Sequence, residues 1–203
     1  ATSTSKSAVS RRLVARTETA LAELMAADLS DLDVVALMVD GAHFAGHCCV
    51  VALGVDIDGT KHPLGVVEGD TENATVVKDL LVDLRDPGLD TARPVLVVID
   101  GAKALASAVN SVFDHPVIQR CQLHKIRNVE AKLPKAVAKT VAKKMRTAYH
   151  DPDALAAEAA LEVLADSLAK SHPGAAGSLR EGLAETLTVA RLEVAPTLGS
   201  ATE

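Results

Sequence analysis

The hexapeptide VVIDGA at residues 97–102 is decisive for the predicted fold, because the closely similar LMVDGA occupies residues 37–42. In each stretch, a run of aliphatic residues ends at an aspartate followed by glycine and alanine. Continuous apolar runs of this length are typical of strands that are buried on both faces of a sheet. If the two strands are neighbours, Asp40 and Asp100 emerge together at one edge of that sheet.

The pattern of apolar runs predicts a three-stranded antiparallel meander over residues 33–70, followed by alternating helices and strands. Asp58 and Gly59 are a hairpin signal between its second and third strands. The later elements are a helix within 71–88, a strand at 93–100, a helix at 102–113 and a strand at 116–121. The order β-β-β-α-β-α-β indicates an α/β fold with a mixed sheet and helices on its faces.

Helices are predicted before and after this region in the sequence. Residues 5–27 contain good helix formers and no glycine or proline. Their first part, STSKSAVSRRL, is similar to the second helix of a helix-turn-helix motif, which also needs a preceding helix and turn. From residue 122 onward the chain is predicted to be helical, with helices at 135–150, 153–172 and 178–192. The predicted regions are a partial helix-turn-helix remnant and linker helix (1–30), the sheet domain (31–121), an all-helical region (122–195) and a frayed end (196–203).

The composition narrows the classes of function. Hydrophobic residues make up 48% and charged residues 24% of the 203 residues, which is typical of a globular chain. Aromatic residues are only 1%, so binding of single-stranded nucleic acid by base stacking is not expected. A net charge of -6 argues against non-specific coating of nucleic acid. Three cysteines do not make a disulfide framework, and no apolar run has the length or setting of a membrane span or signal peptide. We therefore expect a cytoplasmic protein with no membrane partner.

Basic residues are nevertheless concentrated in two segments, residues 5–16 with no acid and residues 120–146 with one. Such segments predict localised contacts with an anion. The candidates for contacts with nucleic acid are Lys6, Arg11, Arg12, Lys125 and Arg127. For Lys139, Lys143 and Lys144, which have helical spacing, a solvated helix face is an equally good interpretation.

The two Asp-Gly stretches have a possible common chemistry. Two carboxylates held close together repel each other unless a cation lies between them. Oxygen ligands without sulfur or imidazole suit Mg²⁺ or Mn²⁺, and two such ions about 3.5–4 Å apart can hold the attacking and leaving oxygens of a phosphodiester. Asp40 and Asp100 are therefore candidate metal ligands. The alternative is turn chemistry, in which Asp100 only caps the following helix, as Asp56 and Asp58 are expected to serve a hairpin.

Cys121 and His124 form a second candidate motif within QRCQLHKIRNV at residues 119–129. Their spacing can place both side chains on one face of a helix. A structural zinc site needs four ligands, and residues 43–49 would supply the others only by an accident of the fold. A nucleophilic cysteine would need exposure, which the end of an apolar strand does not suggest. We favour a packing or hydrogen-bonding role near the acidic site.

Five sequence blocks together resemble a known family. VDGAHF, ALGVDIDGTKHPLGVVEGDTEN, VVIDGAK, QRCQLHKIRNV and SLREGLAETLTVARL occur in the order found in Mutator-type, IS256-like bacterial transposases, and the resemblance runs from about residue 5 to 194. It implies an RNase H-like core with a DDE acidic triad, in agreement with the predicted order of elements. It also implies that Asp40 and Asp100 are the first two acids, that Cys121 and His124 match the family's C-x2-H signature, and that the later helices correspond to a helical insertion.

The activity implied by the resemblance is DNA cleavage and strand transfer at the ends of an insertion element. Water, and then a 3′-hydroxyl, attacks a phosphate between two cations, Mg²⁺ or Mn²⁺. The partners are double-stranded DNA at the element ends and, in the full-length protein, further copies of the same chain.

The sequence also departs from the family pattern. The third acid, a glutamate in a Thr-Asn-x-x-Glu-like setting, has no counterpart, and Glu181 and Glu185 match a different block. Most of the family's N-terminal DNA-binding region is missing too. We therefore expect an incomplete copy, truncated at both ends and weak or inactive. The alternatives are a non-catalytic fragment that binds DNA or transposase as an inhibitor, and an unrelated RNase H-fold nuclease acting on RNA or a DNA junction.

Overall fold

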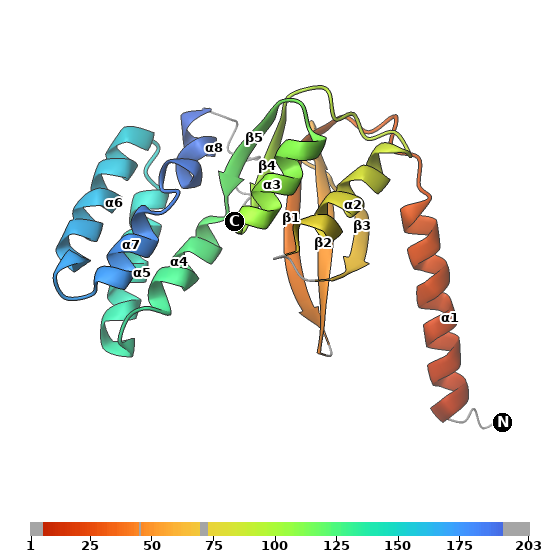
Figure 1. The fold of residues 1–203 in the computed structure, drawn as a ribbon, viewed down its shortest axis with the longest axis horizontal. Coiled ribbons are helices and arrows are strands. Elements are labelled where there is room, and N and C mark those ends of the chain that lie inside the picture. The colour runs from red at the N-terminus through yellow and green to blue at the C-terminus, as the bar shows by residue number, and fades with distance from the viewer. Residues whose placement is uncertain (1–5, 45, 70–72, 193–203) are drawn as a thin grey trace.

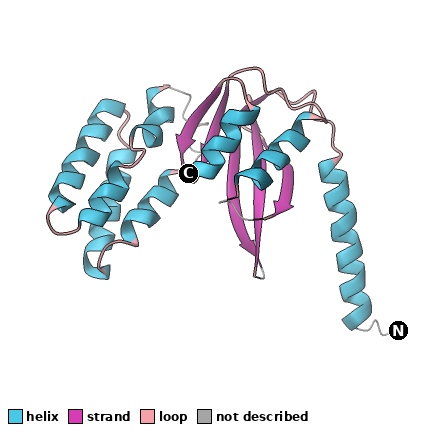
Figure 2. Cartoon of the chain, in the orientation of Figure 1, coloured by secondary structure: helices cyan, strands magenta, loops and turns pink. Residues whose placement is uncertain are grey.

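A five-stranded mixed sheet forms the middle of the structure (Figures 1 and 2). The computed structural model describes residues 6–44, 46–69 and 73–192. The strands are β1 (Val34–Phe44), β2 (His47–Asp56), β3 (Lys61–Glu68), β4 (Val95–Ile99) and β5 (Pro116–Arg120). They lie in the order β3-β2-β1-β4-β5, with β2 antiparallel to its neighbours and β1, β4 and β5 mutually parallel. The predicted mixed α/β class is confirmed.

Helices flank this sheet and extend to one side of it (Figure 1). The first three are α1 (Lys6–Met25), α2 (Ala74–Arg85) and α3 (Lys103–Val112). The remainder, which we call the helical region, comprises α4 (Gln122–Glu130), α5 (Lys135–Tyr149), α6 (Ala154–Ala169), α7 (Pro173–Arg180), the short 3-10 helix η1 (Ala184–Leu187) and α8 (Thr188–Arg191). No helix among the described residues is long and apolar enough to cross a membrane.

Helix α1 projects away from the sheet (Figure 1). Residues 14–23 are all exposed, and only the end of the helix packs, where Met25 contacts the core beside the sheet. The predicted helix over 5–27 is thus present, but it makes few contacts with the rest of the chain.

The first strand is longer than predicted. We expected it to end at Asp40, but β1 continues to Phe44, because β2 pairs with it along its whole length as far as Phe44 and His47. Parallel pairing with β4 stops earlier, at Val39 and Ile99. Asp40 therefore lies inside β1, at the point where the strand loses one of its two neighbours.

The predicted hairpin between β2 and β3 is confirmed, and Asp56 organises it. One oxygen of its carboxylate accepts hydrogen bonds from the backbone nitrogens of Asp58 and Thr60, and Gly59 adopts a φ of 81°. The His62 ring lies 2.7 Å from the other oxygen. This hydrogen bond, more than any other interaction, lowers the pKa of the Asp56 carboxyl below its usual value.

Helix α2 begins where an asparagine can cap it. The Asn73 side chain accepts hydrogen bonds from the backbone nitrogens of Thr75 and Val76, as expected for an N-cap. The face that the helix buries against the sheet consists of Val77, Leu80, Leu81 and Leu84. Val76, at the edge of this face, is half-buried.

Two hydrophobic cores stabilise the chain. The larger one lies between the sheet and helices α2 and α3, and includes Leu81 and Val97. The second lies within the helical region and includes Met145, Leu161 and Leu179. A small third cluster on the opposite face of the sheet joins Leu96 of β4 to the half-buried Val117 and Val189, so that α8 packs against β5.

The prediction of a single helix over 178–192 is wrong. Helix α7 begins at Pro173 and ends at Arg180, and the chain then turns at Gly182, where φ is 60°, before η1 and α8. A Cβ atom at Gly182 would lie 2.4 Å from Cζ of Arg120, a residue on β5. The break therefore reflects packing of the chain around a side chain that is distant in the sequence.

Candidate active site at the edge of the sheet

Asp40 and Asp100 occupy neighbouring positions at one edge of the sheet. Val39 and Ile99 are the last paired residues of the parallel strands β1 and β4, and the two aspartates follow them directly. Adjacent strands are about 4.8 Å apart, so the two residues lie next to each other at this edge. The structure thus brings together the two predicted acids, whose role as metal ligands stays a prediction.

Each carboxylate uses one oxygen in a local hydrogen bond. Oδ1 of Asp40 accepts from the backbone nitrogen of Gly41 at 2.9 Å, and Oδ1 of Asp100 accepts from that of Ala102 at 2.7 Å. The N-cap of α3 is Ala102, which has no side-chain cap, but the bond from Ala102 to Asp100 is local turn chemistry, so this alternative to metal binding stays open. Neither Oδ2 atom accepts a hydrogen bond from a described residue, which leaves both available to a cation.

Helix α4 adds a histidine to this edge. Cys121 is the N-cap of α4, and its backbone nitrogen donates to the carbonyl of Ile99 at 2.7 Å. His124, in the first turn, places Nε2 3.9 Å from Oδ1 of Asp40. Its Nδ1 is buried and has no hydrogen-bond partner among the described residues. This placement agrees with the expectation that the C-x2-H pair lies near the acids.

The donor set fits a magnesium-type ion better than zinc. Among the described residues, no group of three or more His, Cys, Asp or Glu is placed to hold a metal ion. Mg²⁺ is commonly bound by only one or two carboxylates, with water and substrate phosphates completing its shell. The free oxygens of Asp40 and Asp100 match that requirement, whereas a structural zinc site needs four protein ligands.

Arg120 links this edge to the helical region. It is the first residue of the basic segment 120–146. Its side chain is 14% exposed and forms ion pairs with Glu185, through Nε, and with Glu181, at 3.5 Å. It also packs against Gly101, where φ is 99° and a Cβ atom would lie 3.2 Å from Cδ of Arg120. No local sequence pattern reveals this pairing, because Glu181 and Glu185 lie on either side of the turn at Gly182 and not on one helix.

Lys125 does not lie on a surface, contrary to its predicted contact with nucleic acid. The residue is 4% exposed, and its ammonium donates to the carbonyl oxygens of Ser178, at 2.9 Å, and Glu181. Burial lowers the pKa of this ammonium, an effect that the charge of Glu181 opposes. Lys125 therefore fastens α4 to the end of α7.

Gln119 makes a similar internal contact. It is 2% exposed, its amide nitrogen donates to the carbonyls of Arg120 and Thr186, and its amide oxygen accepts from the backbone nitrogen of Val189. The last part of the helical region, from α7 to α8, is thus attached to β5 and α4 through buried polar groups whose partners are more than 50 residues away in the chain.

The other predicted DNA-contacting residues lie on two separate surfaces. Arg11 and Arg12 are exposed on α1, and Lys6 is the first residue of the same helix, with a side chain outside the description. Arg127 is exposed on α4, at the opposite side of the sheet from α1 (Figure 1). No described carboxylate forms an ion pair with Arg11, Arg12 or Arg127.

The chain belongs to the Mutator family of transposases, because the model of that family matches residues 1–196. Three relatives illustrate the similarity. The transposase for insertion sequence element IS6120 of Mycolicibacterium smegmatis is 33% identical over 178 residues, which cover 85% of this chain and 54% of the relative. The transposase for IST2 of Acidithiobacillus ferrooxidans is 31% identical over 69% of this chain and 47% of its own length. That for IS256 in Tn4001 of Staphylococcus aureus is 28% identical over 66% and 34%. The matched part is thus about half of the first relative and less of the others.

Proposed function

We propose that this chain carries the catalytic core of an insertion-element DNA transposase of the DDE type, in which Asp40 and Asp100 are two of the acids. The observation that carries the proposal is that two Asp-Gly-Ala stretches, far apart in the sequence, occupy neighbouring positions at the edge of β1 and β4. The element order of the sheet supports the RNase H-like assignment that the resemblance implies. The relatives named above are transposases for insertion sequence elements, which supports DNA as the substrate.

The residues at the edge have distinct tasks in this proposal. Two divalent cations, when bound, would orient an attacking hydroxyl and stabilise the leaving oxygen of a phosphodiester. Asp40, whose side chain is 55% exposed, presents its free oxygen where a DNA backbone can reach it. Asp100 is half-buried and is held by the backbone of Ala102, so its carboxylate is oriented in advance. His124 is placed to hold Asp40 through its Nε2.

We expect the described residues alone to form a weak catalyst. Glu181 and Glu185 lie close to the edge, but both are ion-paired with Arg120 and do not complete a triad. Loss of one ligand from a two-metal site costs several kcal/mol of transition-state stabilisation, because the charge that develops on the leaving oxygen is less well neutralised.

Nicking of a supercoiled plasmid in Mg²⁺ or Mn²⁺ tests the proposal. Asp40→Asn and Asp100→Asn should each abolish metal-dependent nicking, because each removes one charged ligand. Asp58→Asn, which makes the same change of charge on an exposed hairpin residue, should nick as the unchanged protein does. Nicking that persists in both edge variants, or that is absent from the unchanged protein, would contradict the enzyme.

A second candidate function is a non-catalytic partner of a longer transposase. On the sheet face opposite α2 and α3, neighbouring strands carry the half-buried apolar residues Met38, Val51, Leu53 and Val66. Apolar surface of this kind can mediate association. The test is light scattering of a mixture with a longer family member, which measures the mass of any complex. A defined complex, together with no nicking, would favour this function over the first.

A further inference from the structure

The outward face of α5 carries cations that have no acidic partner. Lys135, Lys139, Lys143, Lys144 and Arg146 are all exposed, and the sequence of α5 contains no aspartate or glutamate. No described carboxylate forms an ion pair with any of them. The sequence alone left open whether such lysines make a solvated face or a binding surface.

In contrast to the cations of α5, Arg180 of α7 and Arg191 of α8 are neutralised by acids of α6. Arg180 pairs with Glu162 at 3.1 Å and Asp166 at 2.5 Å, and Arg191 pairs with Glu158 at 2.8 Å. These three acids are all the acids of α6, the helix next to α5. The acids of α6 are therefore occupied elsewhere, and the positive field of α5 stays open to an external anion.

Helical geometry arranges four of these cations in a line. At about 100° per residue, Lys135, Lys139, Lys143 and Arg146 fall within a stripe about 80° wide, and at 1.5 Å per residue the stripe is about 16 Å long. We call these four residues the α5 stripe. It lies next to the face that α5 buries in the helical core, so its direction is fixed by the packing of residues such as Met145.

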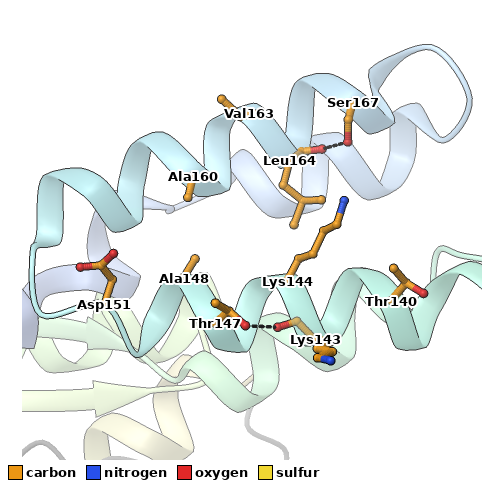
Figure 3. A pocket seen from close by; sticks show the side chains of 10 residues that line it. All are labelled: Thr140, Lys143, Lys144, Thr147, Ala148, Asp151, Ala160, Val163, Leu164 and Ser167. Carbon is orange, nitrogen blue, oxygen red and sulfur yellow. Dashed lines mark hydrogen bonds between the residues drawn. The ribbon is translucent and has the colours of Figure 1, made fainter.

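Lys144 extends this positive surface over a groove between α5 and α6, shown in Figure 3. The groove has a volume of about 510 Å³, and Lys144 reaches across it toward Leu164, whereas Lys143 points away from α6 (Figure 3). Thr140 adds a hydroxyl group to its wall, whereas the hydroxyl of Thr147 donates to the carbonyl of Lys143, and Asp151 adds one carboxylate. Hydroxyl and ammonium groups together are the usual ligands of phosphate oxygens.

One end of the stripe lies against α4. Arg146 and Gln122 line the same small pocket between α4 and α5. His124 follows Gln122 by two positions, and residues two apart do not share a face of a helix. The stripe is therefore a surface separate from the edge that carries Asp40.

We propose that the α5 stripe binds the phosphate backbone of double-stranded DNA. Lysine ammonium groups in a line suit backbone phosphates without reading bases. The stripe has no aromatic residue on which unpaired bases could stack, and no large apolar residue that would enter a membrane. The choice of DNA rests on the proposed function, but the surface does not depend on catalysis.

The test is equilibrium binding of a fluorescently labelled duplex of random sequence, without divalent metal, over a range of salt concentrations. The stripe variant combines Lys135→Gln, Lys139→Gln, Lys143→Gln and Arg146→Gln. Its matched control combines Lys61→Gln, Lys78→Gln, Arg85→Gln and Lys170→Gln, four exposed cations on other surfaces that also lack a described ion pair. Both variants change the net charge equally, and circular dichroism verifies that both are folded.

We expect the stripe variant to bind the duplex at least tenfold more weakly, with a salt dependence shallower by about three to four phosphate contacts, and the control to bind within about twofold of the unchanged protein. Equal losses in the two variants, an unchanged stripe variant, equal binding of single strands or no binding at low salt would overturn the proposal. Binding that depends on the stripe without any metal-dependent nicking would overturn only the proposed function. Nicking that depends on both aspartates, with binding indifferent to the stripe, would overturn only this inference.

Discussion

His124 on α4 and Asp40 on β1 meet at the edge of the sheet, with Nε2 of the ring 3.9 Å from Oδ1 of the carboxylate. The contact depends on the pairing of β5 with β4, because α4 starts directly after β5. The other ring nitrogen, Nδ1, is buried without a hydrogen-bond partner among the described residues. At 3.9 Å the ring lies close to Asp40 without a hydrogen bond to it, and we expect it to support Asp40 when a metal ion is bound.

We predict that His124→Ala lowers metal-dependent nicking by about 10- to 100-fold, the usual effect of losing a group that orients a metal ligand. The measurement is the nicking rate as a function of Mn²⁺ concentration, and the half-saturating concentration should rise. His115→Gln, a change at an exposed histidine before β5, serves as the control. An unchanged metal dependence in His124→Ala would show that the ring does not support Asp40.

Divalent metal should stabilise the folded chain. A cation that binds Asp40 and Asp100 in the native state and not in the unfolded chain favours the native state. We expect 10 mM MnCl₂ to raise the melting temperature by about 2–4 °C over NaCl of equal ionic strength. The double variant Asp40→Asn, Asp100→Asn should lack this difference, and a shift of equal size in that variant would place the metal elsewhere.

Gly182 and Arg120 should be energetically coupled. Gly182→Ala should destabilise the chain by about 2 kcal/mol or more, because a left-handed conformation costs a Cβ-bearing residue about 1–2 kcal/mol and the new Cβ would also collide with Arg120. When Arg120 is also alanine, the combined cost should be about 1 kcal/mol smaller than the sum. Urea unfolding followed by the fluorescence of Tyr149, the one tyrosine of a chain without tryptophan, reports on the helical region.

Gly177→Ala is the control for that cycle, because a Cβ atom there meets nothing within 4 Å and the position is inside α7. It should stabilise the chain by up to about 1 kcal/mol. Strict additivity of Gly182→Ala and Arg120→Ala would mean that the packing of the two residues contributes no energy.

Lys125 and Arg127, two residues apart on α4, should behave in opposite ways. Lys125→Met should leave duplex affinity within about twofold but destabilise the chain by about 1–3 kcal/mol, because two carbonyl groups lose a buried donor. Arg127→Gln, at an exposed position, should leave stability unchanged and reduce the salt dependence of duplex binding by about one phosphate contact. A stable Lys125→Met variant that binds DNA poorly would reverse this assignment.

The helical region should lose stability in strong alkali. Burial raises the pKa of Tyr149 to about 12, and its buried hydroxyl has no hydrogen-bond partner among the described residues. A group whose folded pKa is raised contributes stability that is complete below its unfolded pKa of about 10 and is lost as pH rises through about 12. The loss should be about 2–3 kcal/mol over that window.

Urea unfolding at several pH values, followed by circular dichroism, measures this loss. Tyr149→Phe should be much less sensitive to pH between 10 and 12, because the ionisable hydroxyl is gone. The same alkaline loss in both proteins would assign it to other groups, including the lysines of α5.

Much of the sheet could be predicted because its signals are local. Alternating or continuous apolar runs define the strands, Asp58 and Gly59 define a turn, and Asn73 can cap α2 with its own side chain. The common edge of Asp40 and Asp100 was predictable for the same reason, since each ends a similar apolar run.

The errors share a different cause. The length of β1 depends on how far β2 pairs with it, the break at Gly182 depends on Arg120, and the burial of Lys125 depends on carbonyl groups of α7. Each of these partners is distant in the sequence, and no local pattern at the residue itself reveals it.

The sequence by itself determined the class of the fold, the family and the common edge of Asp40 and Asp100, because these follow from short patterns and their order along the chain. The tertiary structure alone decided which cations have no acidic partner among the described residues. Lys125 and Arg120 are drawn inward by carbonyl and carboxylate groups, while the acids of α6 are engaged by Arg180 and Arg191 and leave the α5 stripe unneutralised. The charged residues can be counted from the sequence. Whether a cation is neutralised by an acid depends on the distance between them, and distances between residues remote in the sequence are set only when the chain folds.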